Sequence, residues 1–378
     1  MRNCTVSGSA SGGMSWRRLC VLLTAILLLA CGKPPPLRVG LLAELSGPSA
    51  DVGEAIRNGA ALALDEAQSE GLLQGRPLAL RVRDTGLYPA SAREAVGSLL
   101  LDGVDFIIGP GTSAMAAAVL PAANEAQVLL ISPTATAVEF HGKDDYLFRV
   151  NWTTRDNASH YARHYHARGF TRFALAVNAD NRAFAQSWLT EFRDALLPLG
   201  GQLVLVEEFE SAAEEVGPLA ERLLAAPADA ILFVASAADA ARLAQQVRKR
   251  DAHRPLLAAE WAGTQQLIEL GGRAVEGMLL VQNFDAHDTS MQYRRFLRAY
   301  VARFGKQPSF HSVLAYDGTR AALQAASRQA RGQSFKEALL AHSPYQGAQQ
   351  PLQFDANGDA GREAYFMLVH EGRFVREP

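Results

Sequence analysis

The chain has 378 residues, more than one ordinary domain contains, so we expect two lobes. Hydrophobic residues make up 48% of the sequence and charged residues 20%, a globular composition that excludes a largely disordered chain. The formal net charge of -2 gives no sign of nucleic-acid binding.

The N-terminal segment predicts a secretory signal peptide. Trp16-Arg17-Arg18 precede an apolar run from Leu19 to Ala30. The run is short for a membrane span but suits the hydrophobic region of a signal. We therefore assign residues 1–30 to the signal peptide, with translation starting at Met1 or Met14. Residues 31–36 are assigned to a tether, because their three prolines make a short, stiff spacer.

The segment Leu28-Leu29-Ala30-Cys31-Gly32 resembles a bacterial lipobox. This resemblance implies cleavage before Cys31 and lipidation of that cysteine, and therefore attachment to a bacterial membrane. The alternative is a cysteine that merely follows an ordinary signal peptide. The positions of Cys4, Cys20 and Cys31, all at or before the cleavage junction, favour the lipid anchor and predict that the rest of the chain has no disulfide.

Strands and helices alternate through the first part of the chain. The expected strands are Leu37 to Ala43, Leu78 to Arg83, Phe106 to Ile108 and Val128 to Ile131. The expected helices are Gly53 to Ser69, Ser91 to Leu101 and Ala114 to Glu125. Short apolar runs separated by helices are typical of parallel strands buried on both faces, so we predict a doubly wound α/β sheet.

The same alternation continues in a predicted second lobe. The strand Tyr146 to Val150 is expected to carry the chain across to it, and Gly277 to Val281 to return the chain to the first lobe. The helices expected after this return are 291–304, 313–331 and 335–340, and the chain should end in a turn at 354–359 and a hairpin-like strand at 365–370. We assign 37–150 and 282–342 to the N-terminal lobe, and 151–281 and 343–378 to the C-terminal lobe. A chain that crosses more than once makes a multi-strand hinge, which suits closure around a ligand.

Two polar turns follow neighbouring expected strands of the first lobe. They are Thr112-Ser113 and Thr134-Ala135-Thr136. In parallel sheets ligands bind beyond the carboxyl ends of the strands, so both turns should lie on the ligand-binding rim. Ser113 can cap the helix that follows, and the free N–H groups of a helix start can hold a carboxylate. Ordinary capping and turn residues remain the alternative.

The chain resembles the type I periplasmic solute-binding proteins of the branched-chain amino-acid (Leu/Ile/Val) and amide family, in its lipoprotein form. The order and spacing of several short pieces support this resemblance over nearly all of the chain after the signal. The pieces are Val39-Gly40 to Pro48, Gly53 to Ala60, Asp84 before Pro89, Val104 to Ser113, Ile131 to Thr136, Tyr146 to Arg149, Glu276-Gly277 and Ala315-Tyr316-Asp317. The resemblance implies two Rossmann-like lobes that enclose a small molecule.

The resemblance also implies which residues bind the ligand. Ser113, Thr134 and Thr136 fall where relatives hold the α-carboxylate of an amino acid. Glu260, after the expected strand 256–259, falls where relatives hold the ammonium group, although a surface glutamate is the alternative there.

Aromatic residues complete the predicted site. Trp261 would cover the ligand, and Phe184 keeps the aromatic wall that relatives often build from a tyrosine. Smaller residues at Val52 and Ser236 than in many relatives predict room for a larger side chain or for an unusual ligand.

An enzyme is not expected. The sequence has no G-x-S-x-G elbow, and Gly109 to Ser113 lacks the ending of a P-loop. His160, His164 and His166 have no adjacent acid to complete a metal site, so we expect a solvated helix there and neither a metal nor a cofactor.

The resulting hypothesis is an extracytoplasmic binding lipoprotein that captures an amino acid, or a similar small carboxylate or amide, and delivers it to an ABC permease. A lipid-tethered ligand sensor, or a cell-envelope regulator that uses the same fold without transport, is the alternative.

Overall fold

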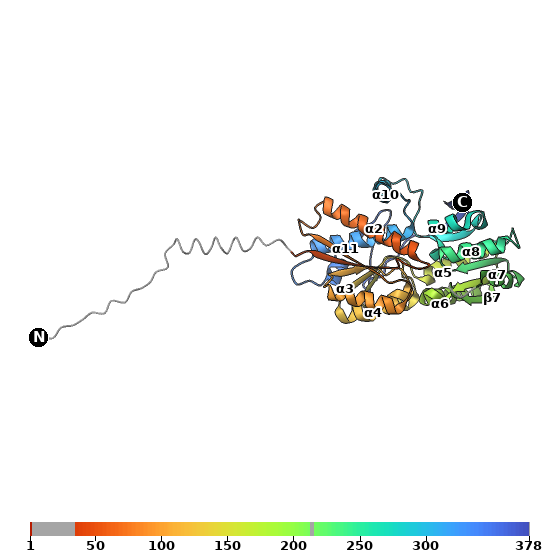
Figure 1. Ribbon diagram of the computed structural model, residues 1–378, viewed down its shortest axis with the longest axis horizontal. Coiled ribbons are helices and arrows are strands. Elements are labelled where there is room, and N and C mark those ends of the chain that lie inside the picture. Colours follow the sequence, from red (N-terminus) through yellow and green to blue (C-terminus); the bar gives the residue numbers. More distant parts are fainter. Residues whose placement is uncertain (2–34, 212–214, 378) are drawn as a thin grey trace.

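The computed structural model describes Met1 and residues 35–211 and 215–377. Cys31 and nearly all of the predicted signal peptide therefore lie outside the described residues. The described chain forms two α/β lobes, each built on its own sheet (Figure 1). Among the described residues, no helix is long and apolar enough to cross a membrane.

The first lobe contains a five-stranded parallel sheet with the order β2-β1-β3-β4-β5. Its strands are β1 (Leu37–Ala43), β2 (Leu78–Asp84), β3 (Phe106–Ile108), β4 (Leu129–Ser132) and β5 (Leu147–Arg149). The helices between them are α2 (Ala50–Ser69), α3 (Pro89–Leu101) and α4 (Ser113–Ala126). This arrangement confirms the predicted doubly wound sheet.

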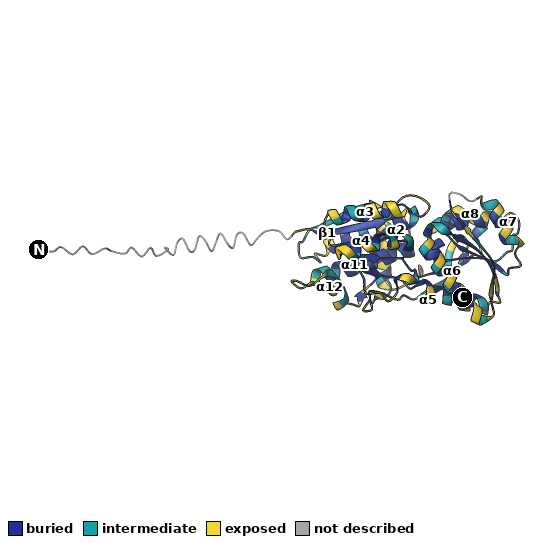
Figure 2. Ribbon diagram, turned by 90° about the horizontal axis from the view of Figure 1, so that it is seen from below, coloured by how far each residue is buried: buried dark blue, intermediate teal, exposed yellow. Residues whose placement is uncertain are grey.

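Apolar residues fill both faces of the first sheet because helices cover both. Leu41 and Ile108 pack in the same buried cluster as residues of α2. Leu42 and Ile107, one position along their strands, pack with residues of α3 and α4 on the opposite face. Figure 2 shows these strands as a buried layer inside the lobe, with the exposed residues on the outer helix surfaces.

The second lobe contains a seven-stranded sheet with the order β14-β13-β10-β9-β8-β6-β7. Its strands are β6 (Arg172–Asn178), β7 (Gln202–Phe209), β8 (Ala230–Val234), β9 (Leu256–Ala258), β10 (Leu279–Gln282), β13 (Tyr365–His370) and β14 (Arg373–Arg376). Its helices are α5 (Thr154–Ala167), α6 (Arg182–Leu196), α7 (Val216–Ala225), α8 (Ala237–Arg248) and α9 (Gln265–Gly271). β13 is the strand expected at 365–370. It forms a hairpin with β14, which was not predicted, and pairs antiparallel with β10.

After β10 the chain returns to the first lobe. The segments there are α10 (Met291–Phe304), α11 (Phe310–Arg328), α12 (Phe335–Ala341) and a small hairpin of β11 (Tyr345–Gln346) and β12 (Pro351–Leu352). α11 packs along α2, and both β11 and β12 contact α11. The described chain thus passes between the lobes after β5, after β10 and after β12, which gives a hinge of three segments.

The contact between α2 and α11 depends on a glycine. A Cβ atom added to Gly59 would lie 2.1 Å from the backbone carbonyl oxygen of Ser312 in α11. Because backbone atoms cannot move aside as a side chain can, only glycine allows these two helices to approach so closely. Gly97, inside α3, has no atom within 4 Å of the position that its Cβ would take.

We predict opposite effects of the same substitution at these two helical glycines. Gly59→Ala should lower the free energy of unfolding by about 1–3 kcal/mol, because the added methyl group forces α2 and α11 apart. Gly97→Ala should raise it by about 0.5–1 kcal/mol, because alanine has the higher helix propensity and the site is open. Urea unfolding followed by circular dichroism measures both, and equal effects of the two substitutions would contradict the packing argument.

Candidate functional site

A small cavity lies between the two lobes, at the carboxyl ends of the strands. Its volume is about 20 Å³. The first lobe and the segment after β5 contribute Val52, Gly111, Thr112, Thr134, Thr136, Asn151, Phe310 and His311, and the second lobe contributes Asn181, Phe184, Glu260 and Trp261. Five of the six predicted binding residues therefore line one cavity, and Ser113 lies buried beside it.

Ser113 shapes the rim of the first lobe. Its Oγ accepts hydrogen bonds from the backbone N–H groups of Thr136 at 3.1 Å and Ala137 at 3.2 Å. These bonds fix the turn after β4, so that the Thr136 hydroxyl is buried at the cavity without a partner among the described residues. The Thr134 hydroxyl donates to the carbonyl oxygen of Gly111 at 2.8 Å, which joins the two predicted turns.

The expectation that Ser113 caps its helix is wrong. The N-cap of α4 is Thr112, whose hydroxyl accepts from the N–H of Met115 at 3.4 Å, and Ser113 is the first helical residue. The expected free N–H groups are also partly occupied. The N–H of Ala114 donates to Oδ1 of Asn181 in the second lobe at 3.0 Å, because closure of the lobes brings that acceptor to the helix start.

Glu44 was not predicted, although it directly follows β1 just as the predicted turns follow their strands. Its side chain is fully buried. Its Oε1 accepts from the N–H of Thr112 at 2.9 Å and from the Thr112 hydroxyl at 2.8 Å, and its Oε2 accepts from the N–H of Gly111 at 3.3 Å. Burial raises the pKa of this carboxyl group, and these hydrogen bonds oppose the shift. Glu44 therefore fixes the loop before α4.

Glu260 is a buried acid on the opposite wall of the cavity. Its Oε1 accepts from Nδ2 of Asn157 at 2.8 Å, and its Oε2 accepts from Nε1 of Trp188 at 3.1 Å. Burial raises the pKa of Glu260 in spite of these bonds. No lysine or arginine is among the described residues that line the cavity. The carboxylate is thus held by neutral donors alone, an arrangement that favours a cation brought by a ligand.

Two predicted aromatic residues meet beside Glu260. The rings of Phe184 and Trp261 pack edge to face, with centroids 5.8 Å apart. The indole N–H of Trp261 is buried and has no partner among the described residues. Together the rings give the second lobe an apolar wall with one free donor.

The three histidines of α5 do not gather into a metal site. All three are half-buried, and the described residues contain no group of three or more histidine, cysteine or acidic residues that could hold a metal ion. An acid does lie beside one of them, contrary to expectation, since Nε2 of His164 is 2.6 Å from Oε2 of Glu377. Glu377 is distant in sequence, so spacing along the chain gave no sign of it.

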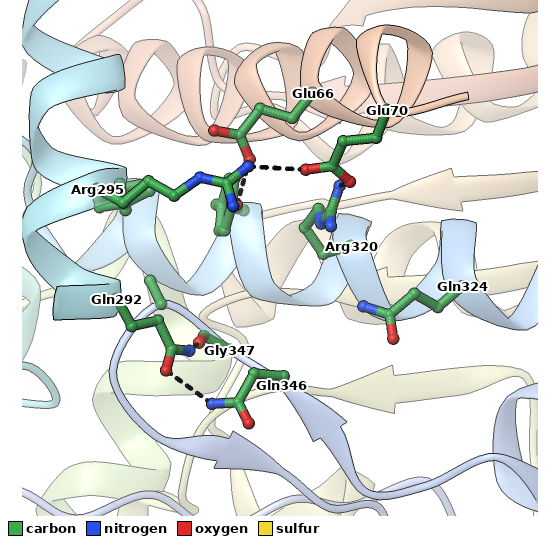
Figure 3. A pocket seen from close by; sticks show the side chains of 11 residues that line it. Glu66, Glu70, Gln292, Arg295, Arg320, Gln324, Gln346 and Gly347 are labelled. Atoms are coloured by element: carbon green, nitrogen blue, oxygen red, sulfur yellow. Dashed lines mark hydrogen bonds and ion pairs between the residues drawn. The ribbon is translucent and has the colours of Figure 1, made fainter. Parts of the chain in front are cut away.

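A larger hollow of about 150 Å³ lies away from the cleft, where α2, α10 and α11 meet (Figure 3). The negative and positive side chains that line this hollow balance one another. Glu70 pairs with Arg295 and with Arg320, each at 2.9 Å, and Glu66 accepts from the Tyr316 hydroxyl at 2.5 Å. This network joins the three helices, whereas Glu260 in the cleft has no such partner.

Two α/β lobes, facing each other across a polar cavity and joined by three crossing segments, define the architecture of a type I periplasmic binding protein. The chain belongs to this family, since the family model for periplasmic binding proteins matches residues 36–373. A Leu/Ile/Val-binding protein, BraC3 of Rhizobium johnstonii, is 24% identical over 273 residues, 72% of this chain and 74% of the relative. A Leu/Ile/Val-binding protein homolog of Brucella abortus is 23% identical over 92% of this chain and 94% of its own length.

Solved structures share the fold. The leucine-binding protein LivK of Thermotoga maritima has a TM-score of 0.83 and 23% identity, with 90% of this chain and 98% of that chain covered. LivJ of Streptococcus pneumoniae, in complex with isoleucine, has a TM-score of 0.82 and 23% identity, with coverages of 90% and 100%. A solute-binding protein of R. palustris in complex with benzoate has a TM-score of 0.82 and 20% identity, with coverages of 90% and 95%.

We predict that Glu260→Gln stabilises the ligand-free protein in a pH-dependent way. Burial raises the pKa of Glu260, so the folded state favours its protonated form. Ionisation of the buried carboxyl group therefore destabilises the folded state. This destabilisation is absent below the ordinary pKa of a glutamate and grows as the pH rises through the raised pKa of Glu260. Glutamine removes it, and its amide can bond to Asn157 if that side chain turns over, because Oδ1 of Asn157 has no partner among the described residues.

Urea unfolding midpoints across a pH series test this prediction. The variant should be more stable than the wild type at about pH 7, and the difference should shrink towards about pH 4. Glu269→Gln, at an exposed position of α9, is the matched control and should show no such trend. A difference that stays constant with pH would contradict the assignment of Glu260 as a buried, unpaired acid.

Proposed function

We propose that this protein is an extracytoplasmic solute-binding lipoprotein that captures an amino acid, or a similar small carboxylate or amide, between its lobes and delivers it to an ABC permease. The observation that carries the proposal is the buried carboxylate of Glu260, which has no cationic partner in the cavity and lies across it from the unpaired hydroxyl of Thr136. The relatives named as Leu/Ile/Val-binding proteins support an amino acid as the ligand.

The first lobe would hold the ligand's carboxylate. The Thr136 hydroxyl is free to donate. Ser113 Oγ accepts two backbone N–H groups, so its own hydrogen is available to a ligand. The N-terminal end of α4 adds a favourable electrostatic potential for an anion, and a carboxylate that replaced the Asn181 oxygen would gain the N–H of Ala114.

The second lobe would hold the ammonium group. Glu260 would form a hydrogen bond to it in which both partners are charged, stronger than the bonds that the carboxylate accepts from its neutral donors. Phe184 and Trp261 would pack against the ligand. Such a ligand is bound at its two ends by different lobes, so binding favours closure.

The lobes must separate for a ligand to enter, because a space of about 20 Å³ holds no more than a water molecule. Side-chain hydrogen bonds are among the contacts that join the lobes across the cleft. They run from Ala114 N to Asn181 Oδ1 at 3.0 Å, from Val138 N to Ser187 Oγ at 3.0 Å and from Thr264 Oγ1 to Asp51 Oδ2 at 2.5 Å. Opening of the hinge would break these contacts.

We predict that an amino acid stabilises the protein and that Glu260→Gln and Thr136→Val weaken its binding. A ligand at a hundred times its dissociation constant should add about 2.7 kcal/mol to the free energy of unfolding. Loss of the charge pair should raise Kd by a factor of about 30 or more, and loss of the hydroxyl should raise it about tenfold.

The experiment is a thermal-shift screen of residues 33–378, unfolded and refolded to remove bound solute, against amino acids, amides and small carboxylates, followed by calorimetric titration. Glu269→Gln should bind as the wild type does. If a simple acid or amide binds and Glu260→Gln leaves its affinity unchanged, the proposed ammonium site is wrong. If nothing in the panel binds, a role in solute capture is wrong.

We predict that Cys31→Ser moves the protein from the membrane fraction to the soluble fraction, because that residue would carry the lipid. Cys20→Ser, inside the predicted signal, is the matched control and should leave the protein on the membrane. Fractionation of cells followed by immunoblotting measures the distribution. Membrane association that is unchanged in Cys31→Ser would rule out this anchor.

A further inference from the structure

Four buried polar atoms around the cavity have no hydrogen-bond partner among the described residues. They are Thr136 Oγ1, Asn151 Nδ2, Trp261 Nε1 and His311 Nδ1. Each of the four residues is between 1% and 5% exposed, and all four line the same cavity. Buried polar groups are nearly always paired, so this cluster indicates a site that is completed by polar atoms from outside the protein.

Asn151 and His311 reach the cavity from segments beyond the predicted site. Asn151 follows β5, at the start of the first crossing, and its Oδ1 accepts from the N–H of Trp152 at 2.9 Å. That bond leaves the Asn151 amide N–H₂ as a free donor. His311 is the second residue of α11, and its ring packs on Phe310 with centroids 3.8 Å apart.

His311 is an uncharged group in this site. Burial lowers the pKa of His311 to about 3, so its imidazole is neutral near pH 7. Glu260 is the one charged side chain among the described residues that line the cavity. His311 can therefore bond to a neutral group, but it supplies no positive charge to a second acid.

The common part of an α-amino acid does not satisfy all of these atoms. Its carboxylate would bond to Thr136 and its ammonium group to Glu260, which leaves the atoms of Asn151, Trp261 and His311. An aliphatic side chain would bury them unpaired, or displace water from them, at a cost of about 5- to 100-fold in affinity for each group. An acidic side chain would place a second negative charge near Glu260 with no cation to balance it.

We propose that the ligand is an α-amino acid whose side chain ends in an uncharged hydrogen-bond acceptor, such as an amide, and that His311 and Asn151 bind this group. The inference rests on the proposed function, because it assumes that an amino acid occupies the cleft. The proposed ligand has a neutral, polar side chain. The amino acids in the names of the relatives have aliphatic side chains.

Isosteric ligands test the proposal. Leucine, asparagine and aspartate share one side-chain shape, and homoleucine, glutamine and glutamate share a longer one. Calorimetric titration of the purified, ligand-stripped protein with all six should show that one amide binds at least about tenfold more tightly than its apolar and acidic isosteres. Equal or tighter binding of the apolar member would overturn this inference and leave the proposed function standing. Binding of none of the six, and of nothing in the wider panel, would overturn both.

Variants of His311 separate ligand recognition from a structural role. His311→Leu should abolish the preference for the amide while binding of the apolar isostere stays the same or tightens. His311→Gln, which keeps a hydrogen-bonding side chain, should retain the preference. If His311→Leu weakens all bound ligands by the same factor, His311 does not select the ligand and the assignment is wrong.

Discussion

The cleft depends on one electrostatic constraint, the burial of the Glu260 carboxylate without a positive charge beside it. Two other acids among the described residues are paired with arginine. Asp317 in α11 pairs with Arg362, and both side chains are fully buried. Glu70 lies between two arginines (Figure 3). These two acids are balanced by arginine, whereas N–H groups of two neutral side chains hold Glu260, and we propose that a ligand supplies its counter-charge.

The second lobe presents an acceptor, the Glu260 carboxylate, whereas the rim of the first lobe presents hydrogen-bond donors. Glu44 determines which of these donors are available, because it occupies some of them. Its carboxylate takes the N–H groups of Gly111 and Thr112, so the loop before α4 is already saturated. Available donors begin one step further on, at the hydroxyls of Ser113 and Thr136, followed by the N–H of Ala114, which donates to Asn181. An anion therefore fits at the first turn of α4 and not in the loop before it.

Local sequence determined what could be predicted. β1 and α10 begin and end where their apolar patterns predict, and β13 matches the predicted strand 365–370, whereas its partner β14 was not predicted. The capping residue of α4 was misplaced by one position, since Thr112 and Ser113 are equally suited to cap and only the backbone geometry separates them.

Contacts between distant segments account for what the sequence did not reveal. Asn181 meets the start of α4 across 67 positions of the chain, and His311 reaches the cavity only because α11 returns to the first lobe. His164 and Glu377 are 213 positions apart. The spacing of apolar residues along the chain predicts which face of a strand or helix is buried. It does not predict which surfaces of the two lobes meet.

The hydrogen bonds within and between the lobes suggest a way to couple binding and movement in the proposed function. Asn181 satisfies the N–H of Ala114 with an amide oxygen, at the place where we propose that a ligand's carboxylate binds. A carboxylate makes a stronger hydrogen bond to the same N–H than a neutral amide does. Exchange of one for the other therefore favours the ligand without leaving a backbone donor unpaired at either stage. On the opposite wall neutral donors hold Glu260, and the proposed ammonium group would add a charged one. Each lobe thus keeps a weaker internal bond that a zwitterion can improve, and a solute that lacks either charge improves only one of them.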